Sequence, residues 1–294
     1  MKNAIKKLTV IMVILTLMSP FICSLHVEAV GDGTASSPWD ISGNEDGSVT
    51  AVLSEDGGTL TISGTGAMKD WDSTSDIPWY AEKDNLEEVI INEGVTNIGA
   101  NAFNSCYKVP IIELPSSVTT IGDDAFHACM GLKNIELPDS VITIGSGAFM
   151  NCWSLTSIKI PYNVGTIQPY TFYGCKELES VDLQGSILEI GDYAFAGCTS
   201  LTNIEIPSCL TRIGYDAFSH CSEDLVIICY EGSAAETYAE QNNIKYIKII
   251  GEWDISENED GSVTAVLTDD GILTISGTGA MRDWNRKWWL CSMA

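Results

Sequence analysis

The chain has 294 residues, of which 45% are hydrophobic, so it can bury a large core and is not a disordered acidic tail. Against 15 Lys and Arg it carries 40 Asp and Glu, which gives a formal net charge of −25. A surface this acidic repels phosphate backbones and anionic lipid headgroups, and this excludes nucleic acid as a partner.

Residues 1–29 have the form of a secretory signal peptide. Three lysines within the first seven residues form a positive n-region, residues 8–25 form an apolar h-region, and Val27-Glu28-Ala29 offers a small-residue cleavage site. The alternative is an uncleaved anchor, because the 18 residues of that h-region can just reach across a bilayer. The flanks favour cleavage near Ala29, so we expect a secreted or cell-surface protein with no transmembrane segment in the mature chain.

Residues 30–85 are expected to form an N-terminal β module that caps the region after it. The block from Trp39 to Trp71 has alternating segments on both sides of Asp56-Gly57, and alternation around Asp-Gly is a signal for a β-hairpin. The module then leads through Asp76-Ile77-Pro78-Trp79-Tyr80 into a repeated region.

From Leu86 to Glu223 the chain repeats every 23 residues without insertion or deletion, which makes six units. Phenylalanine, isoleucine and cysteine each keep one position of the unit: Phe103, Phe126, Phe149, Phe172, Phe195 and Phe218; Ile98, Ile121, Ile144, Ile167, Ile190 and Ile213; Cys106, Cys129, Cys152, Cys175, Cys198 and Cys221. Such a register predicts a repeat architecture rather than a globular domain.

Each unit begins with apolar residues at positions 1, 4 and 6, as in Leu132, Ile135 and Leu137, with a polar residue between the last two. This alternation predicts a short strand with one buried face, which Pro138 ends because proline cannot donate to the ladder. A Val-x-x-Ile-Gly segment and a compact Ala-Phe-x-x-Cys turn bring the chain back. One unit cannot bury its own apolar edge, so the units must stack with parallel strands on one side.

The pattern L-x-x-I-x-[IL]-P-x-x-V-x-x-I-G-x-x-A-F-x-x-C closely resembles the BspA-type leucine-rich repeats of bacterial surface proteins, over residues 86–223. The resemblance implies an α/β, strand-dominated leucine-rich-repeat solenoid, curved and right-handed, with its parallel strands on the concave face and β-hairpin modules leading into it. Departures from the pattern change packing detail only: Val109 for Leu, Gln184 for Pro, Gln168 for Gly, Thr171 for Ala, and Ile187 and Leu210 for Val.

Residues 224–250 break the period and predict a C-terminal cap, which resembles the cap of the same family. The expected order is a strand, a helix begun by Ser233 with Glu236 three residues on, as in a capping box, and another strand.

Residues 251–294 begin a second copy of the hairpin module. The block from Trp253 to Trp284 repeats that from Trp39 to Trp71, one residue shorter at the turn, and no repeats come after it. We interpret this copy as incomplete, the product of a truncated or frame-shifted gene. Four apolar residues should then lack a core to cover and make a poorly ordered or sticky tail: Trp284, Trp288, Trp289 and Leu290.

Motifs for chemistry are sparse. The six cysteines of the repeat column are expected to be free, buried thiols, because stacked side chains about 4.8 Å apart point in parallel and are poorly disposed for bridging. The state of Cys209, Cys229 and Cys291 stays open. The two histidines after residue 29, His127 and His220, lie four repeats apart and cannot share a site. With no C-x-x-C spacing, EF-hand loop or phosphate loop either, we predict no enzyme, catalytic residue, metal site or cofactor.

The exposed face of the strands is the first candidate binding surface. It is formed by repeat positions 3 and 5: Glu113, Asn134, Glu136, Ser157, Lys159, Asp182, Asn203 and Glu205. Like charges on neighbouring strands, about 4.8 Å apart, repel by about 0.9 kcal/mol even in water, and a cationic ligand would relieve that cost. The alternative is that an exposed strand face needs polar residues only for solubility.

The second candidate surface is aromatic and lies in the return turns: Tyr107, Trp153, Tyr170, Tyr173, Tyr193 and Tyr215. Aromatic side chains at turns can be stacking platforms for sugars or hot spots for proteins, or they can simply cover the turn beneath them.

These features favour an exported binding protein that presents its strand face to a protein partner. The family resemblance implies adhesion to host extracellular-matrix proteins or to other cells. The alternative is a glycan-binding or structural module of the cell envelope that uses the turn aromatics, and nothing in the hairpin modules supports a hydrolase. Protein binding through the acidic positions should weaken with salt, whereas glycan stacking should not.

Overall fold

The structure is a computed structural model that describes residues 31–184, 186–256, 258 and 261–281. These residues belong to one compact unit that begins at Gly31. The predicted signal peptide, Cys291 and the apolar residues predicted to form a tail lie outside the described residues.

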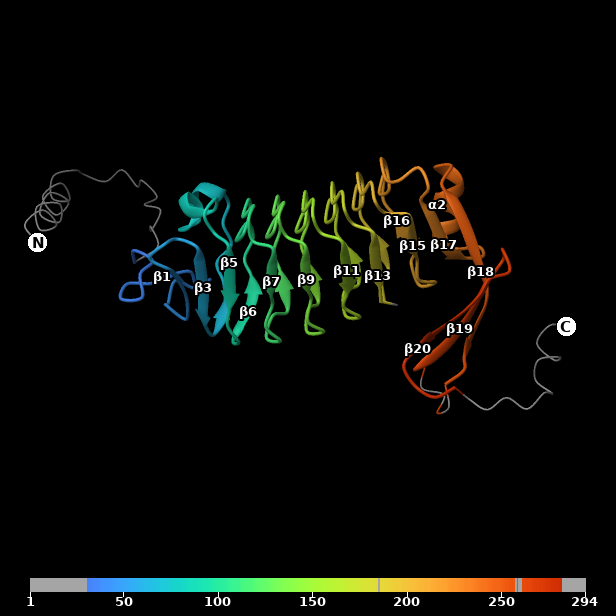
Figure 1. Ribbon diagram of the computed structural model, residues 1–294, viewed down its shortest axis with the longest axis horizontal. Coiled ribbons are helices and arrows are strands. Elements are labelled where there is room, and N and C mark those ends of the chain that lie inside the picture. Colours follow the sequence, from blue (N-terminus) through green and yellow to red (C-terminus); the bar gives the residue numbers. More distant parts are fainter. Residues whose placement is uncertain (1–30, 185, 257, 259–260, 282–294) are drawn as a thin grey trace, which may run out of the picture. The chain divides into compact units, whose positions relative to one another are not determined.

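Each repeat contributes one strand to a parallel column (Figure 1). Strand partners are one repeat apart, as Ile112 opposite Ile135, and the apolar residue at position 4 is at most 9% exposed in all six repeats. The predicted strand-dominated solenoid is confirmed. Its column consists of β5 Glu88–Ile91, β7 Ile111–Glu113, β9 Asn134–Glu136, β11 Ser157–Ile160, β13 Ser180–Leu183 and β15 Asn203–Glu205, followed by β17 Val226–Tyr230.

A second column of very short parallel strands was not predicted from the sequence. Residues at positions 12 and 13 pair across repeats, as Thr143 with Thr120 and Ile144 with Ile121. A strand of two residues has only one buried side chain, so its sequence shows no alternation of apolar and polar residues from which a strand could be predicted. The column consists of β4 Gly66–Ala67, β6 Val95–Ile98, β8 Thr120–Ile121, β10 Thr143–Ile144, β12 Thr166–Ile167, β14 Glu189–Ile190 and β16 Arg212–Ile213.

The return turns are held by a further ladder of backbone hydrogen bonds between repeats. The amide of Phe103 donates to the carbonyl of Ala125 at 2.8 Å, and that of Phe126 donates to Ala148 at 2.8 Å. Positions 16 and 20 of every repeat have φ between 51° and 77°. This left-handed conformation explains why asparagine, aspartate and glycine recur there, and it also holds Tyr170.

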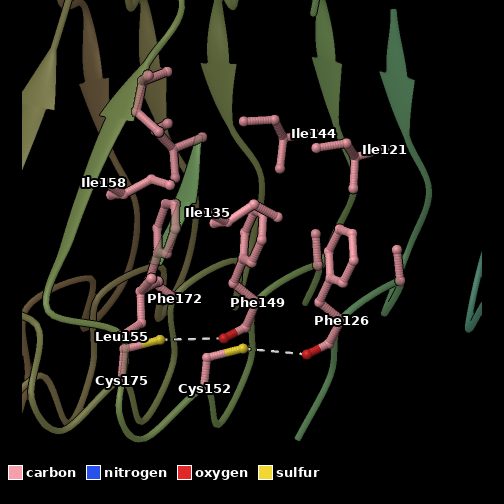
Figure 2. Packing of buried hydrophobic residues seen from close by; sticks show 14 of the residues in the cluster. Ile121, Phe126, Ile135, Ile144, Phe149, Cys152, Leu155, Ile158, Phe172 and Cys175 are labelled. Atoms are coloured by element: carbon pink, nitrogen blue, oxygen red, sulfur yellow. Dashed lines mark hydrogen bonds between the residues drawn. The ribbon is translucent and has the colours of Figure 1, made fainter. Parts of the chain in front are cut away.

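The core is a ladder of stacked phenylalanine rings with a cysteine beneath each one (Figure 2). Successive ring centroids are 5.3–5.6 Å apart and the planes differ by at most 12°. Cys152 and Cys175 donate to the carbonyls of Phe126 and Phe149 at 3.2 and 3.1 Å. The prediction of free thiols is confirmed for the six cysteines of the repeat column, of which Cys221 is only half-buried.

The N-terminal module supplies the first rung of this solenoid. Strands β1 Trp39–Asp40, β2 Val49–Leu53 and β3 Thr59–Gly64 are antiparallel, and β3 then pairs in parallel with β5 of the first repeat. Two short 3-10 helices, η1 Thr74–Asp76 and η2 Tyr80–Glu82, come next. Just before η2, the Trp79 ring continues the phenylalanine ladder, 6.1 Å from Phe103, and is itself packed edge-on by Trp71.

The C-terminal cap ends the ladder with an aromatic ring as well. Helix α2, Ala234–Gln241, begins at Ser233, whose side chain accepts from the amide of Glu236, as the capping signal predicts. From this helix Tyr238 packs edge-on against Phe218 at 6.0 Å. Strand β18, Lys245–Asp254, runs through the boundary expected after residue 250, because it pairs first with β17 and then with β19. Strands β19 Val263–Thr268 and β20 Leu273–Gly277 form the second hairpin.

Replacing Phe149 by alanine should destabilise the protein by about 3–5 kcal/mol, because it removes a fully buried ring from the middle of the ladder and leaves a cavity. Tyr162→Ala is the control, since its side chain is 65% exposed, and it should change the free energy of unfolding by less than about 0.5 kcal/mol. Chemical denaturation measures both, and equal losses would contradict a dominant contribution of the ring ladder to stability.

Candidate binding surfaces

The strand face, defined by positions 3 and 5 of strands β7 to β15, presents all eight residues predicted for it. Every one of them is exposed: Glu113, Asn134, Glu136, Ser157, Lys159, Asp182, Asn203 and Glu205. The parallel register fixes their neighbours, so that Glu113 lies opposite Glu136 and Lys159 opposite Asp182. The face is therefore a rigid row of charges whose spacing the backbone sets.

Four charges of the strand face have no partner among the described residues. Glu113, Glu136, Lys159 and Glu205 make no hydrogen bond and no ion pair through their side chains in the part of the chain that the structure describes. Asp182 accepts from the Gln184 amide at 2.8 Å. Because the side chains stand on hydrogen-bonded strands, a partner could bind them without ordering a loop.

Carboxylates elsewhere on the molecule stabilise the fold instead. Glu93 accepts from the amide and hydroxyl of Ser116 in the next repeat, which lowers its pKa. Asp192 accepts from the amide of Tyr215 at 2.8 Å and pairs with Arg212, which also contacts Glu189. These carboxylates are engaged by the fold, whereas Glu113, Glu136 and Lys159 on the strand face are not.

One end of the strand face carries an acidic cluster that the sequence did not indicate. Burial raises the pKa of Glu205, and the neighbouring Glu252 and Asp182 raise it further. Glu252 belongs to β18 and accepts from the Tyr230 hydroxyl at 2.5 Å. Burial and this carboxylate both raise the pKa of Tyr230. Sequence reasoning missed Glu252 because it lies outside the 23-residue register.

The other end of the strand face is apolar. Ile90 of β5 is 39% exposed and Ile111 of β7 is 53% exposed, and they occupy positions 5 and 3 of their repeats. The register places Ile90 opposite Glu113, so the acidic row borders directly on this apolar patch. A partner for the whole face must combine apolar and basic groups.

Four of the six turn aromatics are in contact as one group. Tyr170 and Tyr193 are stacked at 5.2 Å, Tyr215 meets Tyr193 edge-on at 5.6 Å, and Tyr173 lies 5.9 Å from Tyr170. This group of four, the tyrosine patch, comes from successive repeats because positions 15, 16 and 19 stack in space as the repeats do. The stacked pair, Tyr170 and Tyr193, covers one flat face of each ring. Tyr215 is not stacked, and its side chain is 67% exposed.

The two remaining turn aromatics each pack with a lysine. Lys176 lies over the ring of Trp153 at 3.8 Å, and Lys83 lies 6.0 Å from the ring of Tyr107. Because a lysine already contacts each ring, Trp153 and Tyr107 are weaker candidates for binding a ligand.

The groups that could carry catalysis are dispersed or buried. Burial raises the pKa of Cys175 to about 12, so its thiol is not a nucleophile near neutral pH. His127 lies 3.8 Å from Asp124 and 3.3 Å from the Asn104 amide, in a turn. Within the described residues no group of three or more His, Cys, Asp or Glu is placed to hold a metal ion. The same residues contain no helix long and apolar enough to cross a membrane.

The chain belongs to the family of BspA-type leucine-rich repeat proteins. The model of the BspA type leucine rich repeat region matches residues 78–175 and 143–252, more than half of the chain, with six copies. The family predicted from the sequence is thus confirmed. No curated protein matches the chain.

Two solved structures of other leucine-rich repeat proteins are similar to it. A leucine rich cell surface protein from Faecalibacterium prausnitzii is 28% identical, with a TM-score of 0.53 over 81% of this chain and 62% of that one. A leucine-rich repeat protein from Eubacterium ventriosum is 26% identical over 63% of this chain and 71% of that one, with a TM-score of 0.34. The chain spans less than two thirds of the length of the Faecalibacterium protein.

The cysteine column should resist alkylation in the native protein. Because burial raises the pKa of Cys175 from 9.0 to about 12, its thiolate fraction near pH 8 is about a thousand times smaller than that of an ordinary cysteine. Iodoacetamide labelling mapped by mass spectrometry should find Cys209, which is half-buried, modified before Cys152 and Cys175. In concentrated guanidinium chloride all should react alike. Fast labelling of the column in native buffer would contradict this account.

Proposed function

We propose that the protein is an exported or cell-surface binding protein that recognises a protein partner through its strand face. The observation that supports this most is the row formed by Glu113, Glu136 and Lys159, charges on rigid strands with no partner among the described residues. Membership of the BspA-type leucine-rich repeat family and the likeness to a cell surface protein support an interaction or surface role.

The chemistry of the strand face selects a basic partner with an apolar patch. Carboxylates at Glu113, Glu136, Asp182 and Glu205 attract Lys and Arg, and the exposed isoleucines at the other end require apolar contact. We propose a host extracellular-matrix protein, or a protein on another cell, as the partner, with adhesion as the result. The description of the Faecalibacterium protein as a cell surface protein supports a surface location.

The tyrosine patch supports a second candidate function, which is glycan binding. Tyr215 is 67% exposed, and Tyr170 and Tyr173 of the same patch are each more than a third exposed. Rings held against one another lose little entropy on binding a sugar. A purely structural role in the cell envelope would require neither the strand face nor the tyrosine patch to bind a ligand.

A variant that neutralises the strand face should lose the protein partner. Glu113, Glu136 and Glu205 are changed to Gln and Asp182 to Asn, and binding to a panel of matrix proteins and glycans is measured at low and high salt. We expect affinity for the protein partner to fall about tenfold or more at low salt, with a weaker salt dependence, because four carboxylates no longer attract its cations.

The matched control neutralises four exposed carboxylates away from the strand face: Glu55, Asp139, Glu177 and Glu223. It removes the same net charge and should bind as the unchanged protein does. Equal losses in both variants would show that only net charge matters, and protein binding untouched by the first variant would reject the strand face as the site.

Glycan binding is tested separately by Tyr215→Ser. If the tyrosine patch binds sugar, this variant should lose most of the glycan affinity while the strand-face variant keeps it, and salt should have little effect. The control is Tyr162→Ser, which removes another exposed ring, 65% accessible, from a different turn. A glycan that binds both tyrosine variants equally well would exclude the patch.

A further inference from the structure

The two hairpin modules have the same structure, down to individual hydrogen bonds. Trp39 pairs with Ala51 in the first, and Trp253 pairs with Ala265 in the second. In each, an aspartate carboxylate accepts from the amide two residues on, at 3.0 Å from Asp40 and 2.9 Å from Asp254. An isolated bridge to a methionine closes both modules. Within the described residues, the second hairpin therefore repeats the strand pairing and the local hydrogen bonds of the first.

The two hairpin modules differ in how far their apolar face is buried. In the first hairpin Leu60 and Ile62 are fully buried and Met68 is 2% exposed. The equivalent residues of the second hairpin are exposed by 43%, 51% and 52%, respectively: Leu273, Ile275 and Met281. Beside them lie the only buried apolar residues of the second hairpin that the structure describes: Ile255, Val263 and Ala265. One half of a core is thus in place and the other half is absent.

In the first hairpin this face is covered by a leucine-rich repeat. Strand β3 pairs in parallel with β5, with Leu60 opposite Val89 and Ile62 opposite Ile91. Trp79, which precedes the first repeat, packs 6.1 Å from Trp39 and donates to the carbonyl of Ala102 in that repeat. The occupant of this kind of surface is therefore visible within the molecule itself.

The second hairpin presents the same edge without a strand beside it. Strand β20 is the last strand of its sheet, and within the described residues it pairs only with β19. An apolar edge strand with unpaired amides and carbonyls is a template for another strand. The pattern of residues that repeat 1 contacts in the first copy is retained on this edge, including the leucine, the isoleucine and the methionine.

We propose that the second hairpin is a docking surface for a BspA-type leucine-rich repeat joined to it in the same polypeptide, in the way that repeat 1 is joined to the first hairpin. The repeat's strand pairs in parallel with β20. Its position 4 lies opposite Leu273 and its position 6 opposite Ile275, as Val89 and Ile91 lie opposite Leu60 and Ile62. The surface thereby starts a second solenoid, independently of any partner that the strand face binds.

The test extends the full chain with an array of its own repeats. A copy of residues 72–250 replaces residues 285–294, so that Asp72 follows Trp284 as it follows Trp71 in the natural sequence. Hydrogen exchange followed by mass spectrometry compares residues 272–278 in the extended and the unchanged protein. We expect exchange of the β20 amides to slow by about tenfold or more, because a paired strand opens less often than an edge.

The control is the extended protein carrying Ile275→Asp, which places a charge where the repeat's buried strand residue should lie. Its β20 amides should exchange as fast as those of the unchanged protein, while residues 86–223 keep their protection and so report that the first array is folded.

Three results would overturn the proposal. In the first, the appended array is not protected from hydrogen exchange. In the second, the array is protected but exchange of the β20 amides is unaltered, and in the third the β20 amides of the unchanged protein are already protected. Light scattering then assigns the occupant: a doubled mass indicates a second copy of the chain, and a monomer indicates its own residues 282–294.

Discussion

The structure depends on one constraint, which is that a single repeat cannot cover its own apolar edge. Each Phe ring is covered by an aromatic ring on either side: neighbouring phenylalanines lie 5.3–5.6 Å apart, and Trp79 and Tyr238 cover the two ends at 6.1 and 6.0 Å. From the second repeat on, the thiol of each cysteine in the column donates to the carbonyl of the preceding repeat's phenylalanine, as Cys152 does to Phe126. Stability is therefore a sum over neighbours, and the chain is bound to a 23-residue register in which no insertion is tolerated without breaking several ladders at once.

The same constraint decides where function can lie. Positions 4, 13, 18 and 21 are fixed by the core, and positions 16 and 20 are restricted by their left-handed backbone. Only the outward strand positions and part of the turns can vary freely. On the strand face this freedom is used to place Glu113 beside Glu136, at a cost of about 0.9 kcal/mol in water that no group of the described chain relieves. A cationic partner removes that cost, so the repulsion becomes part of the affinity.

How much the sequence predicts depends on how strongly each feature is repeated. The repeat, its main strand, the buried thiols and the capped helix at Ser233 could all be predicted, because six copies or a specific capping signal mark them. The position of Trp79 on the ladder could not, since it occurs once, outside the register. Glu252 lies on β18, and only the pairing of that strand in the fold brings it to the acidic end of the strand face. The six turn aromatics look equivalent in sequence, yet Lys176 covers the ring of Trp153 while Tyr215 is 67% exposed. Whether a ring is covered depends on single residues near it in the fold, which the repeat pattern does not reveal.

A ladder that grows by neighbours also needs a first rung that is stable before any repeat exists. Strand β3 meets this need because it already has one partner, β2, when the first repeat pairs with its other edge. A hairpin is the smallest unit that can offer such an edge, and Trp39 and Trp71 pack against Trp79, whose ring stacks on Phe103 at 6.1 Å. The opposite end has a different solution, since Tyr238 closes the ladder edge-on and leaves no flat face for another ring. The phenylalanine ladder thus begins with a stacked ring, Trp79, and ends with an edge-on ring, Tyr238.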